Sequence, residues 1–179
     1  MAPLGQSTAA RRVTIVGRYE LTTSLWLPRP RAEVFAFFGD AQNLDAITPP
    51  WLHFRILTPA PIHMRPGTRI DYRLRLRGLP IRWRTEIARW EPPAVFVDRQ
   101  LRGPYTVWVH THTFTDDGSG TRVEDRVVYD FAGGALLHRW LVGPDLRRIF
   151  AYRAEALRRH FGVETTGAPD VRVGPLART

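Results

Sequence analysis

The chain lacks two residue types altogether, cysteine and lysine. Without cysteine it can form no disulfide and offers no thiolate to a metal, which fits a reducing compartment. All 26 basic residues are therefore arginine. A bias this complete is typical of codon choice in a GC-rich genome, and it does not by itself indicate selection for binding phosphate.

Long hydrophobic runs are also missing. Arg11-Arg12 is followed only by the short apolar stretch Val13–Val16, whereas a secretory signal needs an apolar core of about 7–15 residues. No segment approaches the roughly 18 apolar residues of a membrane-spanning helix. We therefore expect a cytoplasmic protein without integral membrane association.

The charge is strongly positive, because only 17 acidic residues oppose the arginines and the net charge is +9. Such a surplus is common among proteins that bind nucleic acids or membrane surfaces. The arginines do not cluster, however, and arginine readily pairs with carboxylates. We do not expect nucleic acid as a partner, and we expect a monomer or a homodimer.

The length of 179 residues suits one domain. We place this domain at residues 18–162, between tails at 1–17 and 163–179. The C-terminal tail is rich in glycine, proline, threonine and arginine and shows no apolar period, so we predict that both ends are flexible.

The order of predicted elements indicates an α+β domain. Residues 18–28 alternate as a strand, and two short helices follow, from Pro30 to Gly39 and from Asp40 to Ile47. Period-two segments separated by short turns then predict an antiparallel meander. These predicted strands are 52–57, 68–77, 81–90, 95–102, 105–115 and 121–131.

A long amphipathic helix closes the predicted domain. Helical segments flank Gly143-Pro144, which should interrupt or kink the helix, and the second of them ends at Gly162. Its apolar stripe must cover the apolar face of the sheet, because no other element remains to do so. The predicted architecture is a curved antiparallel sheet of about seven strands wrapped around this helix.

Strand alternation sorts the side chains into an inner and an outer face. In 68–77 and 81–90 the apolar residues share one face and the arginines share the other, a solvated outer row. In the later strands acidic and imidazole groups fall on the aromatic face. These are Asp98, Gln100, His110, His112 and Asp125.

Burying such groups costs several kcal/mol unless they are hydrogen-bonded and paired. They either satisfy one another in an internal network or line a cavity that a ligand completes, and the aromatic neighbours favour the cavity. The predicted ligand-binding residues are Tyr72, Trp83, Asp98, Gln100, Trp108, His110, His112, Phe114, Asp125 and Tyr129.

The two histidines also admit sharper interpretations. His110 and His112 with Asp98 or Asp125 form a two-histidine, one-carboxylate set of the kind some metals use. Any alternating strand with two histidines gives this spacing, so we expect no metal and no other cofactor. As an enzyme, the chain would use a His–Asp pair from these four residues as general base. The sequence contains no residue in a setting typical of a catalytic nucleophile.

The element order and several segments resemble the START-related helix-grip superfamily (SRPBCC), which includes lipid-transfer domains and polyketide cyclases. The resemblance spans residues 20–161. It is carried by Leu25–Phe35 with its P-x-x-x-V-F step, Gly67–Tyr72, Trp90–Pro93, Asp98–Gln100 with Gly103–Tyr105, and Trp108–Phe114. It implies a deep cavity between sheet and C-terminal helix. The superfamily shares no catalytic residue set, so no catalytic role is transferred.

Three functions remain open from the sequence. The first is binding of a hydrophobic small molecule with a polar head, such as a lipid, a polyketide or an isoprenoid-like compound. The second is a polyketide cyclase or dehydratase that works through the His–Asp pair. The third is an interaction protein that acts on RNA, a membrane or an acidic partner through its arginine-rich outer face.

Overall fold

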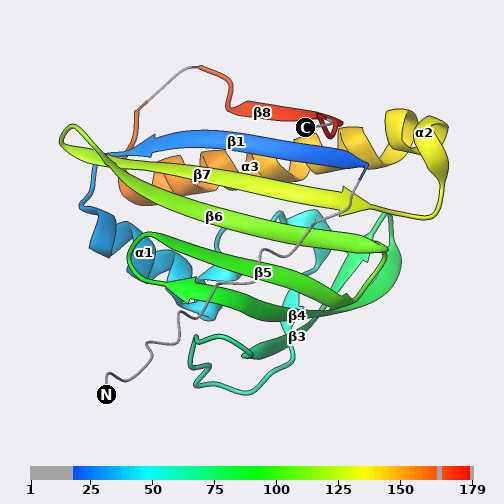
Figure 1. Ribbon diagram of the computed structural model, residues 1–179, viewed down its shortest axis with the longest axis horizontal. Helices are drawn as coiled ribbons and strands as arrows, with labels where there is room; N and C mark the ends of the chain where they lie inside the picture. Colours follow the sequence, from blue (N-terminus) through cyan, green and yellow to red (C-terminus); the bar gives the residue numbers. More distant parts are fainter. Residues whose placement is uncertain (1–17, 165–166, 178–179) are drawn as a thin grey trace, which may run out of the picture.

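Eight antiparallel strands form one curved sheet that wraps around a long C-terminal helix (Figure 1). The computed structural model describes residues 18–164 and 167–177, so the predicted tail at 1–17 lies outside the described residues. The strands are β1 (Tyr19–Leu27), β2 (Arg55–Ile56), β3 (Arg69–Leu76), β4 (Leu79–Glu91), β5 (Val95–Arg102), β6 (Val107–Asp117), β7 (Gly120–Asp130) and β8 (Asp170–Pro175). The helices are α1 (Arg31–Gly39), η1 (Ala41–Leu44), η2 (Pro50–Leu52), α2 (Gly134–Leu137), η3 (His138–Val142) and α3 (Gly143–Phe161).

The strand order β2-β3-β4-β5-β6-β7-β1-β8 confirms the predicted meander and the helix-grip class. Strands β2 to β7 are consecutive neighbours. Short turns join β3 to β7, whereas the longer loop 57–68 joins β2 to β3. The first strand, β1, pairs antiparallel with β7, and Leu21 lies opposite Val127. Within the described part of the chain, no helix is both long and apolar enough to cross a membrane.

The predicted C-terminal tail was wrong for residues 170–175, which form the eighth strand. β8 pairs antiparallel with β1, placing Val173 opposite Leu21 and Val171 opposite Thr23. Both valines pack against the core, and Arg147 donates a hydrogen bond of 2.8 Å to the carbonyl of Val173. The alternation is too short to predict a strand, and it ends in Gly174-Pro175, residues that strands tolerate mainly at sheet edges.

Two predicted elements are shorter in the structure. The second helix reduces to the single turn η1, although Asp40 caps it as predicted by accepting a 2.9 Å hydrogen bond from the backbone N–H of Gln42. The predicted strand 52–57 reduces to β2. His53 interrupts it with a left-handed backbone conformation (φ 44°), which cannot continue a strand.

The C-terminal helix runs through Gly143-Pro144 without a break. Proline has no N–H to donate within a helix, and the chain accommodates it with one wide turn, η3. There the backbone N–H of Gly143 bonds to the carbonyl of His138, five residues back. The predicted interruption is thus a local widening of the helix.

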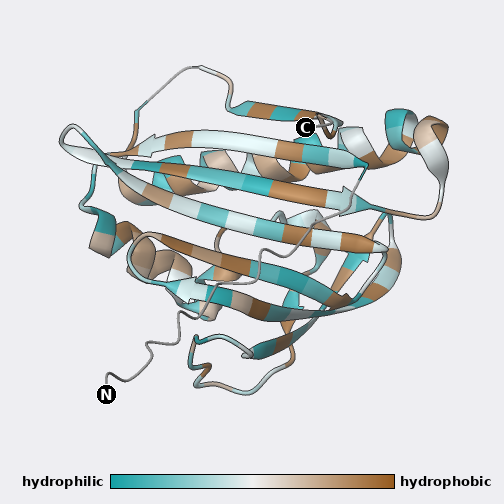
Figure 2. Cartoon of the chain, viewed as in Figure 1, coloured by the Kyte–Doolittle hydropathy of each residue, from teal (hydrophilic) through white to brown (hydrophobic). Residues whose placement is uncertain are grey.

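The core consists of two hydrophobic clusters with polar side chains between them. One lies under α1 and the C-terminal half of α3 and contains Phe35, Phe96 and Phe114. The other, around Trp83 and Tyr129, lies near the start of α3. Hydrophilic and hydrophobic residues alternate along the strands (Figure 2), as expected for a sheet with one buried face.

Candidate functional site

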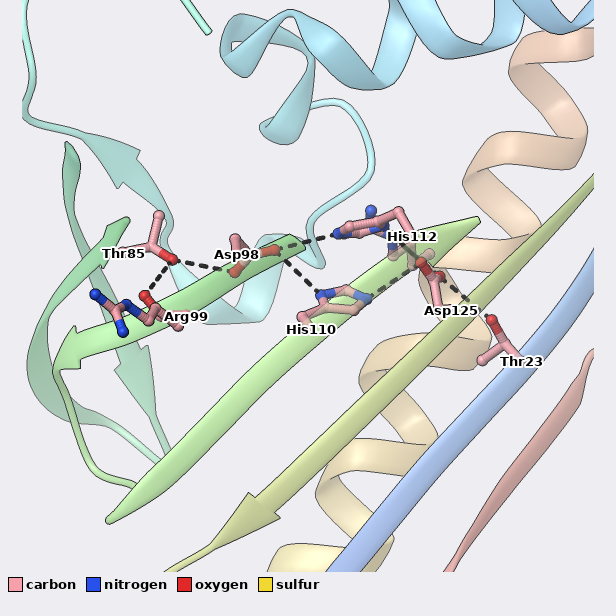
Figure 3. Close-up of polar contacts among 8 residues, drawn as sticks. Thr23, Thr85, Asp98, Arg99, His110, His112 and Asp125 are labelled. Atoms are coloured by element: carbon pink, nitrogen blue, oxygen red, sulfur yellow. Dashed lines mark hydrogen bonds and ion pairs between the residues drawn. The ribbon is translucent and has the colours of Figure 1, made fainter. Parts of the chain in front are cut away.

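Four ionisable side chains from three adjacent strands meet between the two hydrophobic clusters. Asp98 on β5 lies opposite His110 on β6, and His112 lies opposite Asp125 on β7. Because side chains alternate along strands, this register places all four on the inner face. Figure 3 shows them in a row across the sheet, with Thr85 and Thr23 at its two ends. We call Asp98, His110, His112 and Asp125 the His–Asp cluster.

Asp125 lies on one side of both imidazoles. Its Oδ1 is 3.1 Å from His110 Nε2 and 2.7 Å from His112 Nδ1. The second contact is short but poorly aligned as a hydrogen bond, so it acts mainly through charge. Thr23 donates a 3.2 Å hydrogen bond to the other oxygen, Oδ2. Asp125 therefore contacts both imidazole rings on the side that faces away from Asp98.

Asp98 lies on the opposite side of the same rings. Its Oδ2 is 3.2 Å from His112 Nε2 and 3.7 Å from His110 Nδ1. Its Oδ1 accepts a 3.1 Å hydrogen bond from the hydroxyl of Thr85. The two imidazole centroids are 3.8 Å apart, and Phe96 stacks on His112 at 4.0 Å. Packing and hydrogen bonds together fix the orientation of both rings.

Burial and mutual charge act in opposite directions on these groups. Burial would lower the pKa of His112, but the negative charge of Asp125 and the hydrogen bond to Asp98 raise it above its ordinary value. Burial and the neighbouring His112 lower the pKa of His110. Although burial opposes it, His112 and His110 hold the pKa of Asp98 below its usual range and that of Asp125 well below it. These opposite shifts favour a proton on His112 over one on His110.

Arg153 on α3 completes the charge balance of the cluster. Its Nε lies 4.0 Å from Asp125 Oδ2, and its side chain is only 15% exposed. When His112 carries a proton, its imidazolium and the Arg153 guanidinium match the two carboxylates. Arg153 was not among the residues predicted for the site. The signal that could have indicated it is an arginine on the otherwise apolar stripe of the C-terminal helix.

The cluster borders a cavity between the sheet and α3. The cavity has a volume of about 190 Å³ and is walled mainly by apolar side chains. Its walls include six of the ten predicted ligand-binding residues: Tyr72, Trp83, Asp98, Trp108, His110 and His112. Residues not predicted for the site also line it, among them Phe38, Met64, Thr85, Ile149, Phe150 and Arg153.

One wall of the cavity carries a polar atom without a partner. The indole Nε1 of Trp83 is buried and makes no hydrogen bond with the described residues. Buried indole N–H groups normally find an acceptor. Trp83 is also one of the residues that line the cavity.

The other four predicted ligand-binding residues do not line the cavity. Gln100 turns away to the β5–β6 connection, where its side-chain amide bonds to the backbone carbonyl of Tyr105 at 2.6 Å. Phe114 packs among Phe35, Phe38 and Phe96 in the core. The hydroxyl of Tyr129 lies 2.7 Å from His138 Nε2, and Asp125 lies behind the two histidines. Alternation predicted an inner face correctly but could not separate cavity wall from packed core.

Solved structures with the same fold come from distant organisms. Protein CV1439 from Chromobacterium violaceum aligns with a TM-score of 0.64 at 12% identity, covering 82% of this chain and 98% of that one. Protein Ms6760 from Mycobacterium smegmatis aligns at 0.61 and 18% identity, covering 80% and 90%. Major latex-like protein 151 from Panax ginseng aligns at 0.60 and 12%, covering 81% and 99%. At these identities the similarity establishes the fold alone.

The sequence itself identifies the family. Comparison with curated proteins found no match. The family model described as "Polyketide cyclase / dehydrase and lipid transport" matches residues 27–158. This range runs from the end of β1 into the last turn of α3 and includes every residue of the His–Asp cluster. The chain therefore belongs to the polyketide cyclase/dehydrase and lipid transport family, within the START-related helix-grip superfamily.

Proposed function

We propose that the chain binds a compact hydrophobic molecule with a polar end in the cavity between the sheet and α3. Its polar end contacts Asp98, His110 and His112, and its apolar body lies against the aromatic walls. The observation that carries this proposal is a buried ionisable cluster at the edge of an otherwise apolar cavity. Apolar walls with a few convergent polar groups are the usual composition of small-molecule sites.

The size of the cavity narrows the class of ligand. Sites for drug-sized molecules measure about 300–1,000 Å³, whereas this cavity measures about 190 Å³. A molecule of one or two rings, or one end of a longer lipid, polyketide or isoprenoid-like chain, suits this space. The partly exposed lining residues Asn43, Leu44 and Met64 mark the side on which a longer ligand would extend.

A cyclase- or dehydratase-like enzyme is the second candidate, favoured by the contact between His110 and Asp125. A carboxylate 3.1 Å from Nε2 orients an imidazole that can take a proton through its other nitrogen. That nitrogen, Nδ1, belongs to a residue that lines the cavity. This candidate requires the same binding site, so the test of binding comes first.

Several arginines on the outer face of the sheet form ion pairs with carboxylates of the same face, and we assign no function to this face. Arg69 and Arg99 both pair with Glu86, at 3.2 and 2.7 Å, and Arg84 pairs with Asp71 at 2.8 Å. These two carboxylates pair with three of the arginines along β3, β4 and β5. The remaining arginines of this row suit a solvated outer face of the sheet.

Filling the cavity should weaken binding. The two-ring probe 1-naphthol should bind the wild type about 2- to 10-fold more tightly than naphthalene, because one hydrogen bond contributes about 0.5–1.5 kcal/mol. Ile149 lines the cavity from α3, and Ile149→Trp should weaken both probes at least about tenfold, roughly 1.4 kcal/mol. Isothermal titration calorimetry measures both effects.

The matched control adds the same ring system outside the cavity. Leu136 on α2 is 73% exposed, so Leu136→Trp should leave both affinities unchanged. Equal binding of the probes to wild type and Ile149→Trp would place their site elsewhere and reject the proposal.

A further inference from the structure

The atoms of the His–Asp cluster that face one another are all potential metal ligands. One atom each from Asp98, His110 and His112 lie within 4.8 Å of one another. The two histidine contacts to Asp98 Oδ2 are made by His110 Nδ1 at 3.7 Å and His112 Nε2 at 3.2 Å. Two imidazole nitrogens and one carboxylate oxygen thus converge from two adjacent strands (Figure 3).

In each of these three side chains, the polar atom that points away from the convergence contacts another residue. Asp125 Oδ1 lies 3.1 Å from His110 Nε2 and 2.7 Å from His112 Nδ1, and Thr85 donates to Asp98 Oδ1 at 3.1 Å. Metal-binding histidines almost always direct their second nitrogen to a carboxylate, a carbonyl or water, which fixes the tautomer and raises ligand basicity. Asp125 supplies such a carboxylate to His110 through a hydrogen bond and to His112 through a close but poorly aligned contact.

The charges and the position of the cluster also suit a cation. Asp98 and Asp125 bring two negative charges into a buried site. A divalent ion with two neutral imidazoles would offset them in place of a proton on His112, with Arg153 still 4.0 Å from Asp125. Asp98, His110 and His112 line the cavity, whereas Asp125 does not. Coordination positions left open by three protein ligands would therefore face the cavity and its ligand.

We propose that Asp98, His110 and His112 bind one divalent transition-metal ion at the edge of the cavity, with Asp125 as the outer partner of both histidines. Two imidazoles and one carboxylate favour ions such as Fe²⁺, Zn²⁺ or Co²⁺ over Mg²⁺ and Ca²⁺, which prefer oxygen ligands. The sequence alone led us to expect no metal, because any alternating strand with two histidines gives the same spacing. The proposal is independent of the organic ligand.

The test uses the full chain, treated with a chelator, dialysed and titrated with Co²⁺ and Zn²⁺ in the absence of any organic molecule. We expect one equivalent to bind, with visible absorption bands for bound Co²⁺ and a calorimetric isotherm for Zn²⁺. Asp98→Asn and His112→Gln should each weaken Zn²⁺ at least about 100-fold, and Asp125→Asn about 10- to 100-fold. Mg²⁺ should not compete.

A histidine outside the cluster provides the control. His63 lies in the loop before β3, so His63→Gln should leave Zn²⁺ affinity unchanged. Circular dichroism establishes whether each variant is folded. If His112→Gln fails to fold, Asp98→Asn still tests the site, because asparagine keeps an oxygen that can accept the hydrogen bond from Thr85. Two results would overturn the proposal: binding of less than about 0.2 equivalents of Zn²⁺ to the wild type, or equal Zn²⁺ affinity in the wild type and Asp98→Asn. The positive charge that balances the carboxylates would then come from a proton on the cluster and not from a metal ion.

Discussion

Asp125→Ala is expected to lower the free energy of unfolding by about 3–5 kcal/mol, because it leaves buried partners without a counter-charge. The side chain is 6% exposed and contacts His110, His112 and Thr23, with Arg153 at 4.0 Å. Alanine removes every one of these interactions and creates a space that the rigid strands cannot close. Domains are typically stable by only about 5–15 kcal/mol, so this loss is large. Urea unfolding followed by fluorescence measures it.

Two further variants separate burial from the loss of a charge. Asp116 pairs with Arg31 at 3.1 Å but is 67% exposed, so Asp116→Ala should cost no more than about 1 kcal/mol. Asp125→Asn keeps one acceptor oxygen and should fall between the two alanine variants. If Asp125→Ala unfolds within about 1 kcal/mol of wild type, the His–Asp cluster does not have the buried, paired character described above.

Phe114→Ala is expected to cost about 3–5 kcal/mol, the usual range for removing a fully buried phenylalanine. Phe114 is 1% exposed and touches three other phenylalanine rings, with centroids 5.1 Å from Phe35, 5.1 Å from Phe38 and 6.0 Å from Phe96. These rings come from α1 and β5, so the resulting cavity would loosen the contact between the first helix and the sheet. Thermal and urea unfolding measure the loss.

The neighbouring residue Thr115 serves as the control, because it points to the exposed face of the same strand. Thr115→Ala should change the free energy of unfolding by less than about 1 kcal/mol. Since Phe114 does not line the cavity, Phe114→Ala should still bind 1-naphthol when folded. A loss of probe binding in a folded, barely destabilised variant would show that the sequence-based assignment of Phe114 to the ligand site was right after all.

Strand alternation predicted the inner face of the sheet well because the side-chain period of a strand is two. Alternation, with the aromatic residues marking the inner face, places Asp98 with His112 and His110 with Asp125 on one face, although the members of each pair lie on different strands. Their contacts at 3.2 and 3.1 Å follow from the strand register. The turns between strands determine that register, and their sequences are easy to recognise.

The remaining features depend on side-chain direction and on contacts across the fold. Gln100 shares the face of Asp98 but bends to the nearby turn, and Tyr129 shares the face of Asp125 but meets His138 on the C-terminal helix. Arg153 joins the cluster from that helix, at a distance that sequence spacing does not encode. β8 could not be predicted because its pairing with β1 outweighs the weak strand preference of Gly174 and Pro175.

The most direct test of the proposed site is to locate a bound probe by nuclear magnetic resonance. The six tryptophans give separate indole N–H signals when labelled with ¹⁵N, and Trp83→Phe assigns the signal of Trp83. Titration with 1-naphthol should shift the signal of Trp83, whose N–H has no described partner, and those of the His110 and His112 rings. The signal of Trp140, 65% exposed on η3, should stay in place. Shifts at Trp140 without shifts at Trp83 and the histidines would contradict the proposed site.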